Sequence, residues 1–166
     1  MQELDRWLLE TIYNKTKKSP RLKQWAIHMN RLSKVLFNGV YLFLLIYVLV
    51  TRHPEWLKAL GVPLTAYLSA RTIRFFYQRQ RPFVALSQIQ SLIPHKAEAS
   101  FPSMHAMSSM VISLTCYFIL GTWTLWLIPV ALLTALSRVM VGVHYPSDIG
   151  GGALLGMLVS LVAFIP

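Results

Sequence analysis

The chain has 166 residues, of which 55% are hydrophobic and only 13% are charged, and its mean hydropathy is +0.50. This length fits a single domain, and so apolar a composition excludes an ordinary soluble domain and indicates a bilayer protein. Because the net charge of +10 sits on this apolar background, we expect membrane lipids and a lipid phosphate as partners and exclude nucleic acid.

Residues 1–32 contain two amphipathic stretches, in which apolar side chains recur at helical spacing on either side of Ser19-Pro20. Neither stretch is long enough to cross the hydrocarbon. We expect both to form helices at the membrane interface, where their basic side chains can approach the headgroups. The alternative is a charged linker in solvent.

Five later segments are apolar enough to span or nearly span a bilayer, namely 33–50, 57–77, 103–121, 123–141 and 148–165. The second is the weakest, because Arg71 and Arg74 lie in its last turns. In the last span, the spacing of Gly152 and Gly156 predicts close helix packing. The predicted fold is therefore an all-α, integral-membrane helical bundle of about five spans, formed by 33–166, in a single domain over 1–166.

Polar residues cluster at the ends of the predicted spans. If successive spans alternate in direction, the end of the second, the start of the third, the end of the fourth and the start of the fifth share one membrane face. Three groups of polar residues then converge there: Arg74 with Arg81-Pro82, Pro102-Ser103-Met104-His105, and Ser137-Arg138 followed by His144 and Asp148. We expect a functional site at that face.

The converging residue types match a phosphate group. Arg74, Arg81 and Arg138 offer charged, planar donors that suit phosphate oxygens. A helix that begins at Pro102-Ser103 presents free backbone N–H groups and the positive end of its dipole. Because three cations in one pocket would repel one another, an anion is the expected occupant.

Two histidines and an aspartate add catalytic groups. His144 can attack phosphorus if its other ring nitrogen carries the proton, and Asp148 is placed to hold that tautomer. His105 can give a proton to the leaving oxygen. The remaining histidines are interpreted as surface or capping residues: His28, His53 and His95. For His95, a position at the entrance of the site is the alternative.

Together these groups resemble the type 2 phosphatidic acid phosphatase superfamily, also called lipid phosphate phosphatases. The family pattern is Lys-x6-Arg-Pro, Pro-Ser-Gly-His and Ser-Arg-x5-His-x3-Asp, and the resemblance covers about residues 70–160. It implies a nucleophile in His144, an orienting carboxylate in Asp148 and a general acid in His105, with no metal or cofactor. The phosphoryl-binding residues that it implies are Arg74, Arg81, Ser103, Met104 and Arg138.

Two positions depart from the family pattern. Arg74 stands where the family has lysine, which keeps the charge but changes reach and geometry. Met104 stands where the family has glycine, and its backbone N–H can still bind an anion if its φ is negative. Either change can retune the choice of substrate.

Within the superfamily, the loop RPFVALSQIQSLIPHKAEASFPSMHA and the segment VGVHYP look most like undecaprenyl-pyrophosphate phosphatases of the bacitracin-resistance type. This resemblance implies hydrolysis of a polyprenyl pyrophosphate to the monophosphate through a phosphohistidine on His144. The alternatives are a phosphatidylglycerophosphate or other phospholipid phosphatase, a phosphotransferase, and a non-catalytic protein that binds lipid headgroups. The oligomeric state stays open.

The resemblance places the site on the outer side of a cell membrane, but the distribution of charge argues against this orientation. With five spans, eight basic residues within 1–34 share the face of the site, whereas the 51–58 loop carries only two. A re-entrant segment within 1–32 would resolve the conflict. We expect the outward-facing site.

Overall fold

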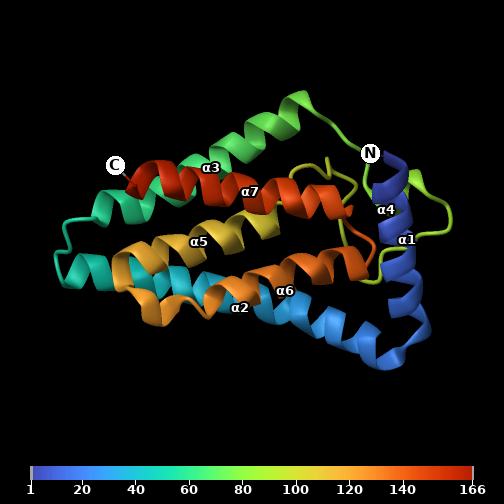
Figure 1. Cartoon of the computed structure of the whole chain (residues 1–166), viewed down its shortest axis with the longest axis horizontal. Helices are drawn as coiled ribbons and strands as arrows, with labels where there is room; N and C mark the ends of the chain where they lie inside the picture. The colour runs from blue at the N-terminus through green and yellow to red at the C-terminus, as the bar shows by residue number, and fades with distance from the viewer. Residues whose placement is uncertain (1, 166) are drawn as a thin grey trace.

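The computed structural model describes residues 2–165, and these residues form helices and connecting loops without a β-strand. The helices are α1 (Gln2–Lys18), α2 (Pro20–Val50), α3 (Trp56–Phe76), α4 (Pro82–Ala85), α5 (Met104–Leu120), α6 (Leu127–Met140) and α7 (Pro146–Phe164), with a 3-10 turn at Thr122–Thr124. Helix α5 packs against α2, α3, α6 and α7 at the centre of a bundle. Helices α1 and α4 lie together at one end of it (Figure 1).

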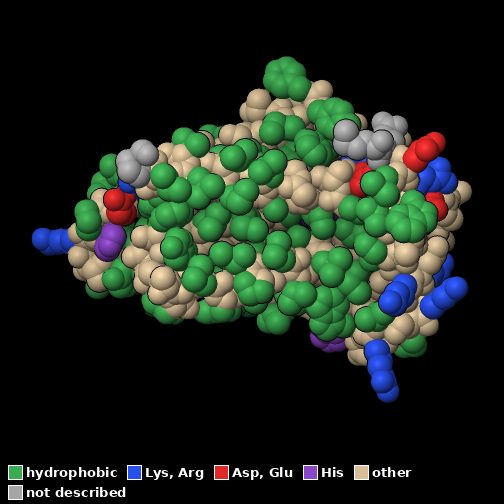
Figure 2. Space-filling model, in the orientation of Figure 1, with side chains coloured by type: hydrophobic (Ala, Val, Ile, Leu, Met, Phe, Trp, Pro, Cys, Tyr) green, Lys and Arg blue, Asp and Glu red, His purple; other side chains and the backbone are tan. Residues whose placement is uncertain are grey.

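The predicted all-α class is confirmed, and four of the five predicted spans correspond to α3, α5, α6 and α7. Helix α2, the segment Thr122–Met140 and α7 are long and apolar enough to cross a membrane, and α5 is a shorter apolar helix. The number of five spans stays a prediction. Apolar side chains cover the sides of the bundle, and basic side chains gather mainly at its α1 end (Figure 2), as expected for a protein embedded in a membrane.

The N-terminal segment differs from the prediction in one respect. Ser19 caps α2 by accepting a hydrogen bond from the backbone N–H of Leu22, and Pro20 follows as the first helical residue, so the predicted break before Pro20 is confirmed. The second amphipathic stretch is not a separate helix, because α2 continues from Pro20 to Val50 without interruption. No proline or glycine interrupts the helix before Gly39, so nothing ends it there. Residues 2–50 contain no re-entrant hairpin that would resolve the conflict over orientation.

Glycines let α7 approach α5 closely. A Cβ atom added at Gly152 would overlap the carbonyl oxygen of Ser103, and one at Gly156 would overlap that of Met107. The close packing predicted from this glycine spacing is therefore confirmed. It holds the start of α5 beside the first turns of α7, where several of the predicted site residues lie.

Candidate active site

His144 lies in the turn that joins α6 to α7. Gly142 begins that turn with a φ of 77°, a left-handed conformation that favours glycine. A side chain at Gly142 would meet Ile89 at 3.0 Å and Tyr13 at 3.1 Å, so the turn packs tightly beneath α1 and the 77–103 loop. His144 is consequently 1% exposed.

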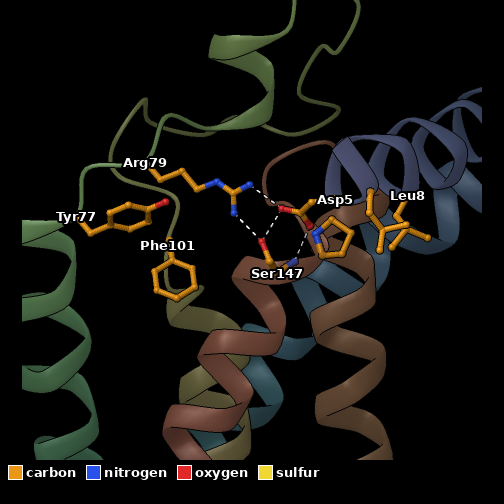
Figure 3. A pocket seen from close by; sticks show the side chains of 8 residues that line it. Asp5, Leu8, Tyr77, Arg79, Phe101 and Ser147 are labelled. Carbon is orange, nitrogen blue, oxygen red and sulfur yellow. Dashed lines mark hydrogen bonds and ion pairs between the residues drawn. The ribbon is translucent and has the colours of Figure 1, made fainter. Parts of the chain in front are cut away.

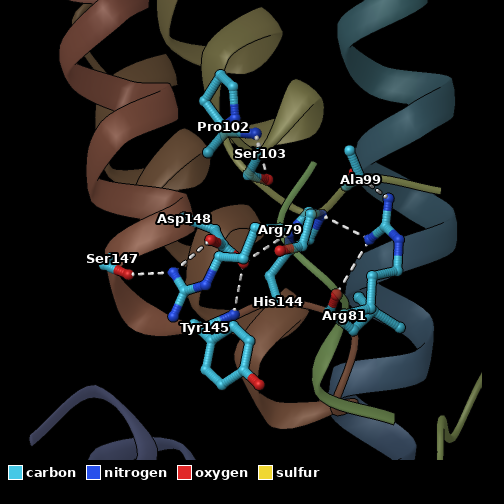
Figure 4. A network of polar contacts seen from close by, with 12 residues as sticks. Arg79, Arg81, Ala99, Pro102, Ser103, His144, Tyr145, Ser147 and Asp148 are labelled. Carbon is cyan, nitrogen blue, oxygen red and sulfur yellow. Dashed lines mark hydrogen bonds and ion pairs between the residues drawn. The ribbon is translucent and has the colours of Figure 1, made fainter. Parts of the chain in front are cut away.

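The two ring nitrogens of His144 face different partners (Figure 4). Nδ1 lies 3.4 Å from Oδ2 of Asp148, and Nε2 lies 3.2 Å from Nη1 of Arg81. Because a guanidinium only donates, we assign the proton to Nδ1 and the free lone pair to Nε2. Asp148 also accepts a hydrogen bond from the backbone N–H of Tyr145 at 2.9 Å, which fixes the carboxylate. This is the tautomer that a nucleophilic imidazole needs.

The charge state of this pair follows from its burial. Burial lowers the pKa of His144 to about 4; the hydrogen bond with Asp148 acts against this shift, and the charge of Arg81 acts with it. His144 is therefore neutral at neutral pH. Burial also lowers the pKa of Arg81 to about 10, with the charge of Arg74 acting in the same direction, so Arg81 remains a cation at pH 7.

Backbone carbonyl groups hold two of the arginines. Arg81 donates from Nε to the carbonyl of Glu98 at 2.9 Å and from Nη1 to that of Val143 at 3.0 Å. Arg74 donates from Nε and Nη2 to the carbonyl of Pro102 at 3.0 and 2.8 Å. These neutral acceptors fix the guanidinium groups without cancelling their charge, so both remain available to an anion.

Arg138, in the last turn of α6, is completely buried. Within the described residues 2–165, its Nε and Nη2 atoms have no hydrogen-bond partner. A buried guanidinium with two free donors is costly unless an anion meets it. Arg138 is thus the strongest indication in the structure of an anion-binding position.

The start of α5 supplies backbone donors, as predicted. The Ser103 hydroxyl caps the helix by accepting from the N–H of Ala106 at 3.4 Å, and the Ser103 N–H donates to the carbonyl of Asp148 at 2.9 Å. The N–H groups of Met104 and His105 follow in the first turn, which has no acceptors of its own for them. Met104 has a helical backbone, so the negative φ that anion binding needs is present. Its side chain lines an apolar cavity.

His105 stands apart from the pair formed by His144 and Asp148. Its ring lines two cavities, of about 310 and 250 Å³, and the charges of Arg138 and His144 act on it. In the described part of the chain, no hydrogen bond or ring stacking joins it to His144. The structure therefore brings His144, Asp148 and Arg81 into contact, whereas the role of His105 stays a prediction.

Sequence reasoning missed a further ion-pair network at the site. Arg79 donates to Oδ1 of Asp148 at 2.8 Å and to Oδ2 of Asp5 at 2.6 Å, and it lies 3.9 Å from the centre of the Tyr145 ring. Asp5 also accepts from the backbone N–H of Ser147 at 2.9 Å and from its hydroxyl at 2.5 Å. Figures 3 and 4 show these contacts. They tie α1 to the first turn of α7, beside a cavity of about 610 Å³.

Residues 55–165 match the sequence profile of the PAP2 superfamily. The chain belongs to the PAP2 superfamily. It is 38% identical over 92 residues to undecaprenyl-diphosphatase BcrC of Bacillus subtilis, across 55% of this chain and 47% of that protein. It is 36% identical over 113 residues to decaprenylphosphoryl-5-phosphoribose phosphatase of Mycobacterium tuberculosis, across 67% of this chain and 60% of that protein. The PAP2 chain thus spans about half the length of the curated relatives it matches.

Two solved structures have the fold of this PAP2 chain. The crystal structure of LpxE from Aquifex aeolicus superposes with a TM-score of 0.79 at 24% identity, covering 96% of this chain and 94% of that one. A PAP2-type phosphatidylglycerolphosphate phosphatase from Bacillus subtilis superposes with a TM-score of 0.77 at 22% identity, covering 97% and 83%. The family resemblance, including that to the bacitracin-resistance type, is confirmed by the PAP2 profile match and by the BcrC match.

Only weak signals in the PAP2 sequence indicate the missed network. Asp5 and Asp148 are the only aspartates in the chain, and Arg79 precedes the motif residue Arg81 by two positions. A carboxylate in the first turn of an amphipathic helix is usually solvated, so Asp5 gave no local sign of a buried partner.

His95 lies beside the PAP2 site, in agreement with its alternative interpretation as a residue at the entrance. The centre of its ring is 6.4 Å from that of His144, with the two planes at 83°. Burial lowers the pKa of His95, and the charge of Arg81 acts in the same direction. His95 therefore forms part of the wall around the nucleophile candidate.

Proposed function

We propose that this chain is a membrane lipid phosphatase that hydrolyses a polyprenyl diphosphate, such as undecaprenyl diphosphate, to the monophosphate. The observation that carries the proposal is the buried imidazole of His144, whose Nε2 lone pair faces Arg81 while Nδ1 faces Asp148. The relative named undecaprenyl-diphosphatase supports the choice of substrate.

The proposed reaction has two chemical steps. Nε2 of His144 attacks the distal phosphorus, and the bond from that phosphorus to the bridging oxygen breaks with its electron pair on the oxygen. His105 gives this oxygen a proton, and Asp148 stabilises the charge that develops on the imidazole. Water then attacks the phosphohistidine, and His105 takes a proton from the water. The bond from phosphorus to Nε2 breaks with its electron pair on Nε2, and inorganic phosphate leaves.

The arginines provide the electrostatic stabilisation in this proposal. Arg138 has free donors for the phosphoryl oxygens, and Arg81 exchanges its contact with Nε2 for one with phosphate when substrate binds. These cations and Arg74 supply the positive charge that a metal would otherwise supply. Among residues 2–165, no group of three or more His, Cys, Asp or Glu side chains could hold a metal ion.

The test is phosphate release by the purified protein in detergent. We expect His144→Ala to lower the rate roughly 10³-fold or more, because the nucleophile is lost. His28→Ala is the matched control, since His28 is an exposed histidine on α2. EDTA should leave the wild-type rate unchanged. Equal rates in His144→Ala and wild type, or no release by wild type, would contradict the proposal.

A second candidate substrate is a sugar phosphate carried on a polyprenyl lipid. The relative named decaprenylphosphoryl-5-phosphoribose phosphatase matches more of this chain than BcrC does, 67% against 55%. A panel of polyprenyl diphosphate, polyprenylphosphoryl pentose phosphate, phosphatidylglycerophosphate and phosphatidic acid separates these substrates by kcat/KM. A non-catalytic headgroup-binding protein would release phosphate from none of them.

A further inference from the structure

A polar cavity of about 250 Å³ lies between α2, α5 and α6. Its polar lining includes Lys34 and Asn38 from α2, His105 and Ser108 from α5, and Thr134 from α6. So many polar groups are unusual among apolar helices that pack in a membrane, and they usually mark a pathway or a binding position. His105 belongs both to this cavity and to the proposed reaction.

The cavity lies deeper in the bundle than Arg138, the buried arginine with free donors. The side-chain amide of Asn30 donates to the hydroxyl of Ser137 at 3.0 Å, which sets that turn of α2 level with Arg138. Lys34 follows Asn30 by one helical turn, and Thr134 precedes Ser137 by nearly one turn. Because α2 leaves the site end of the bundle and α6 returns to it (Figure 1), both cavity residues lie about 5 Å deeper.

Lys34 is the lysine that lines this cavity, although the residue as a whole is exposed. No ion pair joins it to a carboxylate in the described residues. Its positive charge acts on His105 and also on His95. An ammonium group on a helix that enters a membrane either reaches toward the headgroups or meets an anion. The shared cavity gives it an anion to meet, if the leaving group of the reaction is itself charged.

We infer that Lys34 binds the leaving-group phosphate of a diphosphate substrate; this inference rests on the proposed function. When Nε2 of His144 attacks the distal phosphorus, the electron pair of the broken bond passes to the bridging oxygen. With a diphosphate, that oxygen belongs to a lipid monophosphate, which stays an anion even after it takes a proton from His105. With a monoester, the same proton yields a neutral alcohol, which needs no cation. Lys34 therefore favours diphosphates over monoesters.

The test compares kcat/KM for polyprenyl diphosphate and for phosphatidic acid, a monoester, in wild type and in Lys34→Met. We expect the substitution to lower the diphosphate value by about 10- to 100-fold, the effect of one charge-assisted hydrogen bond, and the monoester value by less than about threefold. Lys34→Arg keeps the charge and should keep the selectivity. Lys23→Met removes the same charge from an equally exposed position of α2 that does not line the cavity, and it should change neither value.

A second measurement uses the products as inhibitors of the same reaction. Lys34→Met should weaken inhibition by polyprenyl monophosphate about tenfold and leave inhibition by inorganic phosphate unchanged. Parallel losses on both substrates, or no loss on either, would overturn the assignment of Lys34 while the proposed function stands. A wild type that cleaves only monoesters would also overturn it. If wild type cleaves neither substrate, the proposed function fails and this inference falls with it.

Discussion

At the scale of single residues, the neutral state of His144 follows from its burial beside two arginines. Burial lowers the pKa to about 4, because the imidazolium form loses its hydration, and the charge of Arg81 further disfavours that form. We expect the His144 ring to stay neutral as the pH falls from 7 to about 5 and to gain its proton only near pH 4.

Histidine ¹⁵N chemical shifts measured against pH in detergent check this expectation. The signals of His144 are those that disappear in His144→Gln. Asp148→Asn removes the hydrogen bond that raises the pKa, so the pKa of His144 should fall further in that variant. A His144 ring that is protonated at pH 6 in wild type would contradict the buried, neutral nucleophile.

Asp5 is expected to act as a positioning residue. In Asp5→Asn the amide can still accept from the backbone of Ser147, but the charge that holds one side of Arg79 is lost. Asp148 is then the carboxylate that still pairs with Arg79, and a stronger pull from Arg79 competes with the contact between Asp148 and His144. We expect kcat to fall about tenfold with KM nearly unchanged.

Steady-state kinetics of Asp5→Asn and of Glu3→Gln check this prediction. Glu3 is an exposed carboxylate on the same helix, so its substitution should change neither constant. The thermal midpoint of Asp5→Asn should show that the protein is folded. Equal effects of the two variants, or a change in KM alone, would rule out the positioning role.

The residue types and their spacing predicted which residues lie at the centre of the site, but not the network of Asp5 and Arg79 beside it. His144, Asp148 and Arg81 stand at fixed spacing from span ends, and the topology of alternating spans brings those ends together. Asp5 and Arg79 meet only through tertiary packing, which no local pattern encodes. The sequence predicted an anion from a cluster of arginines, and the free donors of Arg138 are consistent with that prediction. The sequence could not reveal which arginines bind backbone carbonyls, as Arg74 does.

At the scale of helices, the contact of α7 with α5 depends on Gly152. A Cβ atom there would overlap the backbone carbonyl of Ser103, which cannot move as a flexible side chain can. We expect Gly152→Ala to separate the start of α5 from α7, to lower stability by about 1–3 kcal/mol and to lower phosphate release.

Thermal unfolding in detergent and the phosphate assay measure both effects. Gly150→Ala is the matched control on the same helix, because a Cβ there has nothing within 4 Å. It should be neutral or stabilise α7 by about 0.5–1 kcal/mol, the usual gain of alanine over glycine within a helix. If both substitutions behave alike, close packing at Gly152 does not position the site.

Hydropathy predicted most helices, because a segment that crosses a membrane must be long and apolar and must satisfy its own backbone. Hydropathy did not predict the features of the fold that depend on neither the length nor the apolar composition of a segment. The continuity of α2 depends on the absence of a helix breaker between Pro20 and Gly39, whereas polarity changes along that stretch. Helix α4, at Pro82–Ala85, is too short for any periodicity to reveal.

At the scale of the whole molecule, the facing side of the site can be measured directly. Gln88 lies in the loop at the site end, beside Ile89, which packs near the His144 turn, and Thr122 lies at the opposite end of the bundle. The native Cys116 is buried and should not react. We expect an impermeant thiol reagent to label Gln88→Cys in whole cells and Thr122→Cys only after permeabilisation.

The opposite labelling pattern would place the site inside and agree with the positive-inside rule. The structure bears on this choice, because α1, which has basic residues in its last turn, lies at the end of the bundle where α6 is joined to α7 (Figure 1). The basic residues of α1 therefore lie on the same side of the membrane as the site, whichever side that is.

The bonds between Asp5 and Ser147 join residues 142 positions apart, which sets an order of events during synthesis. Helix α1 can bind this partner only after the residues that separate Asp5 from Ser147 have been synthesised, since Ser147 lies in the first turn of α7. The carboxylate of Asp148 and the imidazole of His144 belong to that same late segment. The nascent protein therefore acquires the proposed nucleophile and the contacts that brace it together, once this segment has been made.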